Sequence, residues 1–276
     1  MSKRVIVMDV DGTLATSQKE ISPRTKNALI KAQEQGDLII LASGRPTSGL
    51  LDFAKDLLMD SYQGLLVSYN GSKVVNAKTH EVLFDQTLSI EQAKAVLQHL
   101  KKFRLIPMVD KDDYLYVHDV FQGYIDFQGQ PFNVIEYESR GGKFKLCEQD
   151  DLAEFVDFPM NKIIVAGDPD YLQENYQAMM APFKDSLNCV FTGPFYFEFT
   201  AKGIDKAKAL DTVLRPLGYN SQDVIAFGDR HNDMTMLDYA GIGVAMGNAV
   251  PEVKAMANHT TASNDEDGIA KFLDNL

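Results

Sequence analysis

The chain has 276 residues, a formal net charge of −12 and a hydrophobic content of 45%, which together predict a packed globular protein. A surface this negative repels phosphate backbones. We therefore expect neither nucleic acid nor an anionic membrane as a partner. No apolar run is long enough to cross a bilayer, and the chain enters a strand directly after Arg4, without the apolar segment of a signal peptide. We therefore expect a cytoplasmic protein, in which Cys147 and Cys189, lacking metal-ligand spacing, are reduced thiols.

The first third of the chain alternates short apolar runs with helical patterns. Ser22 is expected to cap a helix that starts at Pro23 and stops at Gly36. Asn70-Gly71 is a strong tight-turn signal, so the chain should double back there as a hairpin. The expected elements are a strand at 5–8, a helix at 23–35, a strand at 38–42, a helix ending near 59, a strand at 64–68 and a returning strand at 73–76.

The last third follows the same order, and the middle of the chain differs from both. Residues 85–195 combine amphipathic helices with alternating, aromatic-rich strands, which predicts an inserted α+β domain with an antiparallel sheet. Residues 1–84 and 196–276 should form one doubly wound α/β core with a mostly parallel sheet. The later core elements are expected as a helix at 202–217, a strand at 223–227, a helix ending near 239, a strand at 243–246 and helices from 251 and 267.

Polar clusters follow three of the predicted parallel strands. Asp9 and Asp11 end the first strand, Ser43-Gly44-Arg45 follows the second, and Asp229, Asn232 and Asp233 follow the strand at 223–227. Open α/β sheets bind ligands at the carboxyl ends of their strands. Converging carboxylates favour a hard cation such as Mg²⁺, and the amides near Gly12 and Ser43-Gly44 suit an anion.

The order and spacing of these clusters resemble those of haloacid-dehalogenase-superfamily phosphatases, in particular the Cof-type branch that includes bacterial sugar phosphatases. The run Asp9-Val10-Asp11-Gly12-Thr13 is similar to the first motif of that family, Ser43-Gly44-Arg45 to the second, and Gly228-Asp229 with Asn232-Asp233 to the fourth. For the third motif, Lys206 stands four residues before Leu210, as in the family pattern. Lys202-Gly203 is the literal Lys-Gly pair and remains the alternative.

The resemblance implies a role for each matching residue. Asp9 would be the nucleophile and Asp11 the general acid and base; Mg²⁺ would be held by the side chains of Asp9 and Asp229 and the main-chain carbonyl of Asp11. The expected phosphate-binding residues are Ser43, Gly44, Lys206 and Asn232. Asp233 would orient Lys206 or a metal-bound water without binding the metal itself.

The resemblance implies a Rossmann-like core with a C2-type cap at 85–195, which would choose the substrate. The expected activity is Mg²⁺-dependent hydrolysis of small phosphorylated metabolites, with sugar phosphates leading and FMN or pyridoxal phosphate as alternatives. A phosphotransferase or phosphomutase using the same aspartyl phosphate, and a non-catalytic phosphosugar-binding regulator, remain open. Arg45 is expected in a structural ion pair rather than as a phosphate clamp, and His231 as an exposed loop residue.

Overall fold

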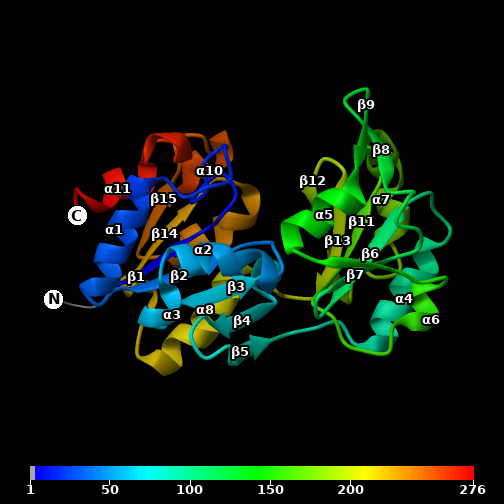
Figure 1. Ribbon diagram of the computed structural model, residues 1–276, viewed down its shortest axis with the longest axis horizontal. Coiled ribbons are helices and arrows are strands. Elements are labelled where there is room, and N and C mark those ends of the chain that lie inside the picture. Colours follow the sequence, from blue (N-terminus) through cyan, green and yellow to red (C-terminus); the bar gives the residue numbers. More distant parts are fainter. Residues whose placement is uncertain (1–3) are drawn as a thin grey trace. The chain divides into compact units, whose positions relative to one another are not determined.

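The computed structural model describes residues 4–276, which form two compact units. The core unit comprises the chain up to Asp85 together with Asp205–Leu276, and the inserted unit comprises Gln86–Ile204. Figure 1 shows the chain leaving the core unit once and returning to it once. No helix among the described residues is long and apolar enough to span a membrane.

The core unit contains an eight-stranded sheet in the order β16-β15-β14-β1-β2-β3-β4-β5. Neighbours are parallel from β16 to β3, and β4 and β5 add to that edge antiparallel. The strands are β1 (Val5–Met8), β2 (Leu38–Ala42), β3 (Leu65–Ser68), β4 (Lys73–Asn76), β5 (Val82–Asp85), β14 (Val224–Gly228), β15 (Ile242–Ala245) and β16 (His259–Thr260).

The centre of this sheet is β1, which pairs with both β14 and β2. Its four residues are apolar and fully buried, because both faces of a parallel sheet are covered. Val5 is opposite Val224 on one side and Leu38 on the other, so the three strands end together. The predicted doubly wound α/β fold is confirmed. The three polar clusters lie together at the carboxyl ends of β1, β2 and β14.

Helices cover the sheet, with α1 packed on α11 and α8 on α9; Figure 1 shows α1 and α11 side by side. The α-helices of the core unit are α1 (Pro23–Glu34), α2 (Leu51–Asp56), α3 (Met59–Tyr62), α8 (Lys206–Leu214), α9 (Met234–Tyr239), α10 (Pro251–Met256) and α11 (Gly268–Leu273). The 3₁₀ helices are η1 (Thr47–Leu50), η2 (Tyr69–Gly71), η3 (Arg215–Leu217), η4 (Ser221–Asp223), η5 (His231–Asp233) and η6 (Asn264–Glu266).

The inserted unit has a six-stranded sheet in the order β10-β7-β6-β11-β13-β12 and a separate hairpin, β8-β9. All sheet pairs are antiparallel except β10 with β7. The strands are β6 (Ile106–Lys111), β7 (Tyr114–Val117), β8 (Tyr124–Phe127), β9 (Gln130–Asn133), β10 (Lys145–Glu148), β11 (Lys162–Ala166), β12 (Leu187–Gly193) and β13 (Tyr196–Ala201). The helices are α4 (Ile90–Leu100), α5 (Val134–Gly142), α6 (Leu152–Phe155) and α7 (Pro169–Met180).

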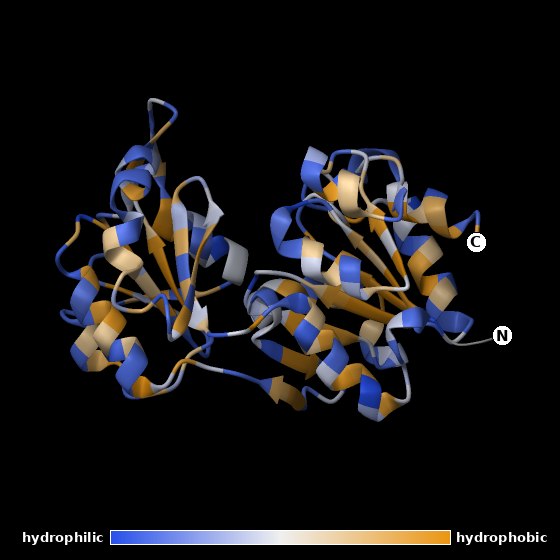
Figure 2. Ribbon diagram, turned by 180° about the vertical axis from the view of Figure 1, so that it is seen from behind, coloured by the Kyte–Doolittle hydropathy of each residue, from blue (hydrophilic) through white to orange (hydrophobic). Residues whose placement is uncertain are grey.

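Each unit has its own apolar interior. Figure 2 shows hydrophobic strands at the centre of both units and hydrophilic residues on the outer sides of many helices. In the inserted unit, alternate residues of β11 enter two different apolar clusters: Ile163 and Val165 one, Ile164 and Ala166 the other. This alternation follows from the two-residue period of a strand, and it buries both faces of the sheet.

Three predicted boundaries differ from the structure. The inserted unit extends to Ile204 rather than residue 195, because β13 pairs with β11 and β12. The helix expected from residue 202 begins at Lys206, because the Asp205 side chain caps it by accepting a hydrogen bond from the Lys208 amide. The helix expected to end near residue 59 is interrupted, because Leu58 has a left-handed φ of 55°.

Candidate active site

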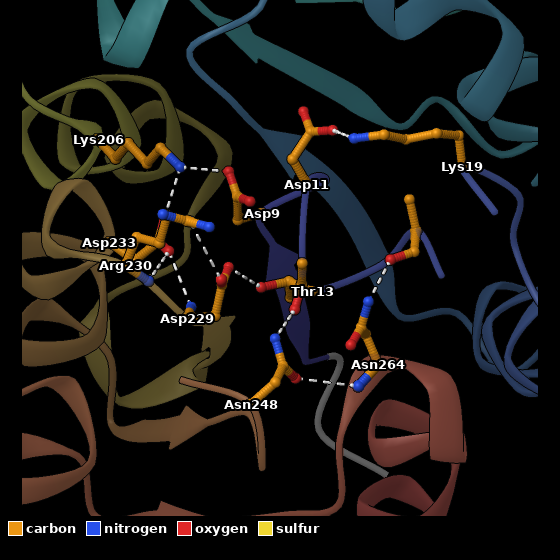
Figure 3. A network of polar contacts seen from close by, with 12 residues as sticks. Asp9, Asp11, Thr13, Lys19, Lys206, Asp229, Arg230, Asp233, Asn248 and Asn264 are labelled. Carbon is orange, nitrogen blue, oxygen red and sulfur yellow. Dashed lines mark hydrogen bonds and ion pairs between the residues drawn. The ribbon is translucent and has the colours of Figure 1, made fainter. Parts of the chain in front are cut away.

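Three aspartates and one lysine meet beyond the carboxyl ends of β1 and β14 (Figure 3). Asp9 directly follows β1, while Asp229 and Asp233 follow β14. Lys206 is the first residue of α8, and its side chain has no exposed surface. Its Nζ donates to Oδ1 of Asp9 at 2.7 Å and to Oδ1 of Asp233 at 2.6 Å. The lysine therefore links the ends of two neighbouring strands.

Both carboxylate oxygens of Asp233 are bound by protein groups. Oδ1 accepts from Lys206, and Oδ2 accepts from the main-chain amides of Asp229, at 2.9 Å, and of Arg230, at 3.0 Å. This carboxylate therefore holds the lysine in place and shapes the turn after β14. Such a pattern suits an orienting residue better than one that ligates a metal directly.

Asp229 lies against the loop that follows β1. Its Oδ1 accepts a hydrogen bond of 2.9 Å from the hydroxyl of Thr13, a buried side chain. Gly12 has φ +84°, and a Cβ there would stand 2.5 Å from Oδ2 of Asp229. Glycine is therefore required both by the backbone conformation and by the approach of the carboxylate.

The electrostatics of this cluster call for another cation. Burial raises the pKa of Asp9 to about 8, and the charges of Asp233 and Asp229 add to the effect although Lys206 opposes it. Burial and the charge of Asp233 raise the pKa of Asp229 to about 6. One buried lysine thus faces three carboxylates, one oxygen of each lying within 4.8 Å of the others. The donor set fits Mg²⁺, a hard divalent ion that prefers a few carboxylates.

The side chain of Asp11 points elsewhere. Arg45 donates to its two oxygens at 2.7 and 2.8 Å, Lys19 adds a contact of 3.1 Å, and the carboxyl side chain remains 42% exposed. Burial alone would raise its pKa, but the hydrogen bonds and charge of Arg45, with Lys19, hold the pKa of Asp11 at about 2. Figure 3 shows this carboxylate directed toward Lys19 rather than Asp9. The expectation that Arg45 forms an ion pair is confirmed.

A second group of predicted residues surrounds Asn70. The Asn232 side chain donates to Oδ1 of Asn70 at 3.1 Å, and a Cβ on Gly44 would stand 3.1 Å from the Asn70 amide. Ser43 is buried, and its hydroxyl oxygen accepts a bond of 3.2 Å from the Arg45 amide. That bond leaves the Ser43 hydroxyl proton free to be donated to an anion.

The structure thus joins Asp9, Lys206, Asp229 and Asp233, but not the Asp11 carboxylate. The structure places the two candidate lysines of the third motif, Lys206 and Lys202, in different units. Lys202 belongs to the inserted unit, where its Nζ donates to the main-chain oxygen of Asp185 at 2.5 Å. His231 is exposed, as expected.

Four residues near the site were assigned no catalytic or binding role from the sequence: Thr13, Asn70, Asn248 and Asn264. The Asn248 side chain donates to the Gly12 carbonyl at 2.7 Å and accepts a hydrogen bond from the main-chain amide of Asn264. The Asn264 side chain in turn donates to the Ala15 carbonyl at 2.8 Å. These two asparagines fasten the loop after β1 from more than 230 residues away along the chain. No local pattern marks such a contact, whereas Thr13 at least belongs to the first motif.

Comparisons with known proteins identify the family. The family model described as haloacid dehalogenase-like hydrolase matches residues 6–273. A solved haloacid dehalogenase-like hydrolase from Bacteroides thetaiotaomicron is 32% identical, with a TM-score of 0.90 and 99% of each chain covered.

Two curated relatives are named for what they hydrolyse. The pyridoxal phosphate phosphatase YbhA of Escherichia coli is 28% identical, with 99% of this chain and 98% of the relative covered. The 5-amino-6-(5-phospho-D-ribitylamino)uracil phosphatase YcsE of Bacillus subtilis is also 28% identical, with 98% and 94% covered. Both act on small phosphorylated metabolites by name, and both align over nearly their whole length.

Proposed function

The chain belongs to the haloacid dehalogenase-like hydrolase family and is a phosphoric monoester hydrolase, and from this premise we propose a Mg²⁺-dependent phosphatase that uses Asp9 as its nucleophile. The observation that carries the proposal is the pair of bonds from Lys206 to Asp9 and Asp233. A buried lysine beside a strand-end carboxylate keeps that carboxylate positioned and partly neutralised. It also leaves a positive charge where the oxygens of a phosphoryl group would lie.

Asp9 would attack phosphorus and release the alcohol, forming an aspartyl phosphate that water then hydrolyses. A carboxylate nucleophile needs no base, and splitting the reaction into two displacements lowers each barrier. Ser43, Gly44, Lys206 and Asn232 would donate hydrogen bonds to the phosphoryl oxygens. They come from three segments of the core unit: the end of β2, the start of α8 and the turn after β14, which supports a preformed anion cradle.

Asp11 would give a proton to the leaving alcohol and later take one from the attacking water. The carboxylate that Arg45 and Lys19 hold is charged, so it must leave them and gain a proton before it acts as an acid. Its exposed side chain leaves room for that rotation. Arg45 would then keep Asp11 out of the site until a substrate arrives.

Mg²⁺ would be held by the side chains of Asp9 and Asp229 and the main-chain carbonyl of Asp11. When bound, it would offset the repulsion between the carboxylates and the phosphate dianion. The raised pKa values of Asp9 and Asp229 support this assignment, because burial and the neighbouring carboxylates disfavour the charged forms that a bound cation would stabilise.

The substrate is proposed to be a small phosphorylated metabolite in the cytoplasm, with sugar phosphates as the leading class. The names of two relatives add pyridoxal phosphate and a phosphorylated ribityl compound to the substrates to be tested. The inserted unit is proposed to determine which of these substrates is accepted.

The proposal is tested with Asp9→Asn and with metal removal. Asp9→Asn should abolish hydrolysis of p-nitrophenyl phosphate while leaving the melting temperature near that of the unchanged protein, and EDTA should stop turnover until Mg²⁺ is restored. Substantial turnover by Asp9→Asn would contradict the nucleophile, and activity that survives EDTA would contradict the metal. A panel of sugar phosphates, FMN and pyridoxal phosphate, ranked by kcat/KM, tests the substrate class, and added acceptor alcohols reveal any phosphotransfer.

A further inference from the structure

The Asn70-Gly71 pair, predicted as a simple hairpin turn, has an unusual conformation. Tyr69, Asn70 and Gly71 all have left-handed backbone angles, with φ of 51°, 56° and 102°. A large aromatic residue such as Tyr69 rarely adopts a positive φ. Backbone strain of this kind persists where surrounding contacts enforce it, and it is frequent at functional sites.

The contacts that enforce this turn come from the segments that carry the proposed phosphate-binding residues, called the cradle below. The Tyr69 and Asn70 amides donate at 2.9 Å to the carbonyls of Arg45 and Ser43, respectively. A Cβ on Gly71 would stand 2.3 Å from the carbonyl oxygen of Asp205, the residue that caps α8 just before Lys206. The turn is therefore packed between the strand end that carries Ser43 and Gly44 and the helix start that carries the buried lysine.

The Asn70 side chain reaches a third segment of the cradle. Its Oδ1 accepts the hydrogen bond of 3.1 Å from the Asn232 amide nitrogen, and its amide lies beside Gly44. An asparagine amide presents either its oxygen or its nitrogen, depending on its partners. An acceptor at Asn70 selects the nitrogen of Asn232, so the second N–H of that nitrogen is available to an anion.

We propose that Asn70 is a positioning residue for the phosphoryl group, which it serves by orienting the side-chain amide of Asn232. This inference rests on the proposed function and deepens it. Asparagine also tolerates a left-handed backbone, which would explain the residue as part of a turn. A role in the turn alone does not account for the bond between the two side chains, and an experiment separates the two.

The test uses Asn70→Gly, Asn232→Ala and the double variant. Glycine removes the side-chain amide and accepts a left-handed φ without strain, so the turn should survive. His80→Gly is the matched control, because His80 also has a left-handed φ, 58°, and an exposed side chain in the core unit. Binding of inorganic phosphate in Mg²⁺ buffer is measured by calorimetry, and hydrolysis of p-nitrophenyl phosphate is measured beside it.

Asn70→Gly should weaken phosphate binding and lower kcat/KM by about tenfold, because an unoriented Asn232 amide loses its hydrogen bond to the charged phosphoryl group. The melting temperature should stay unchanged, and His80→Gly should match the parent protein. In the Asn232→Ala background, Asn70→Gly should have no further effect on phosphate binding, because its action passes through Asn232.

The inference is overturned if Asn70→Gly behaves like His80→Gly, or if its full effect persists in the Asn232→Ala background. A parent protein that binds phosphate but hydrolyses no ester would contradict the proposed function and leave the binding test of Asn70 intact. A parent protein that neither binds phosphate in Mg²⁺ buffer nor hydrolyses p-nitrophenyl phosphate would overturn both.

Discussion

Replacing Lys206 by methionine removes the positive charge at the centre of the site and keeps most of the side-chain volume. The lysine is completely buried, and both of its bonds go to carboxylates, at 2.7 and 2.6 Å. Burial alone would lower its pKa, but the charges of Asp233 and Asp9 raise the pKa of Lys206 above its usual value. Lys206→Met therefore leaves Asp9 and Asp233 buried without their cation, while Asp229 keeps the partly exposed Arg230 at 3.6 Å.

The expected losses of stability and of activity in Lys206→Met can be estimated from these contacts. Removing one partner of a buried ion pair costs about 3–5 kcal/mol of folding free energy while the remaining charges persist. The carboxyls can escape part of that cost by binding protons, and the pKa of Asp9 already stands at about 8 with the lysine present. Without Lys206 that pKa should rise further. A protonated Asp9 is a poor nucleophile, and a preorganised donor to the phosphoryl group is also lost, so kcat/KM should fall at least about 10²–10³-fold.

The pH dependence of stability follows from the sign of the shift. A carboxyl group whose pKa is higher in the folded than in the unfolded state binds more protons when folded, so folding weakens as the pH rises between the two values. The stability deficit of Lys206→Met should therefore be larger at pH 8 than at pH 6. Thermal unfolding at both pH values, in metal-free buffer, measures it.

The matched control is Lys202→Met, because Lys202 lies in the inserted unit and donates to a main-chain oxygen. It should keep the activity of the parent protein in initial-rate assays with p-nitrophenyl phosphate. The reasoning fails if Lys206→Met keeps more than about a tenth of kcat/KM, well above the loss expected for such a donor. It also fails if Lys202→Met is equally impaired.

Two further predictions concern the metal and the inserted unit. Mg²⁺ should raise the melting temperature more at pH 8 than at pH 6, because Asp9 and Asp229, with pKa values raised to about 8 and about 6, must lose protons before a cation binds; a larger shift at pH 6 contradicts this. Lys162→Met should destabilise the inserted unit by about 3–5 kcal/mol in chemical unfolding, because buried Lys162 pairs with Glu198 at 3.0 Å. The exposed Lys145→Met should cost no more than about 1 kcal/mol, and equal costs for the two variants would refute the argument.

The elements that carry the site were largely predictable from the sequence. The apolar runs at β1, β2 and β14 are short, β-branched and followed by polar residues, so both the strands and their ligand-binding ends follow from local composition. Parallel pairing then brings those ends to one edge. For this reason Asp9, Asp229 and Asp233 could be placed together before their distances were known.

The choice of lysine depended on the fold. Sequence spacing favoured Lys206 but left Lys202 possible, and both were expected on one helix. The structure starts α8 at Lys206 and leaves Lys202 in the inserted unit. The physical reason is the cap at Asp205, which ends the extended chain and points the next side chain toward Asp9.

The sequence by itself thus determined the α/β core and the strand-end carboxylates, because each depends on residues near one another in the chain. The tertiary structure decided how those carboxylates are paired: Asp9 with Lys206, and Asp11 with Arg45. It also decided that Asn70, read as a turn residue, touches Asn232. Contacts between residues more than 150 positions apart have no local signature, because the energy that forms them comes from packing of the whole sheet edge.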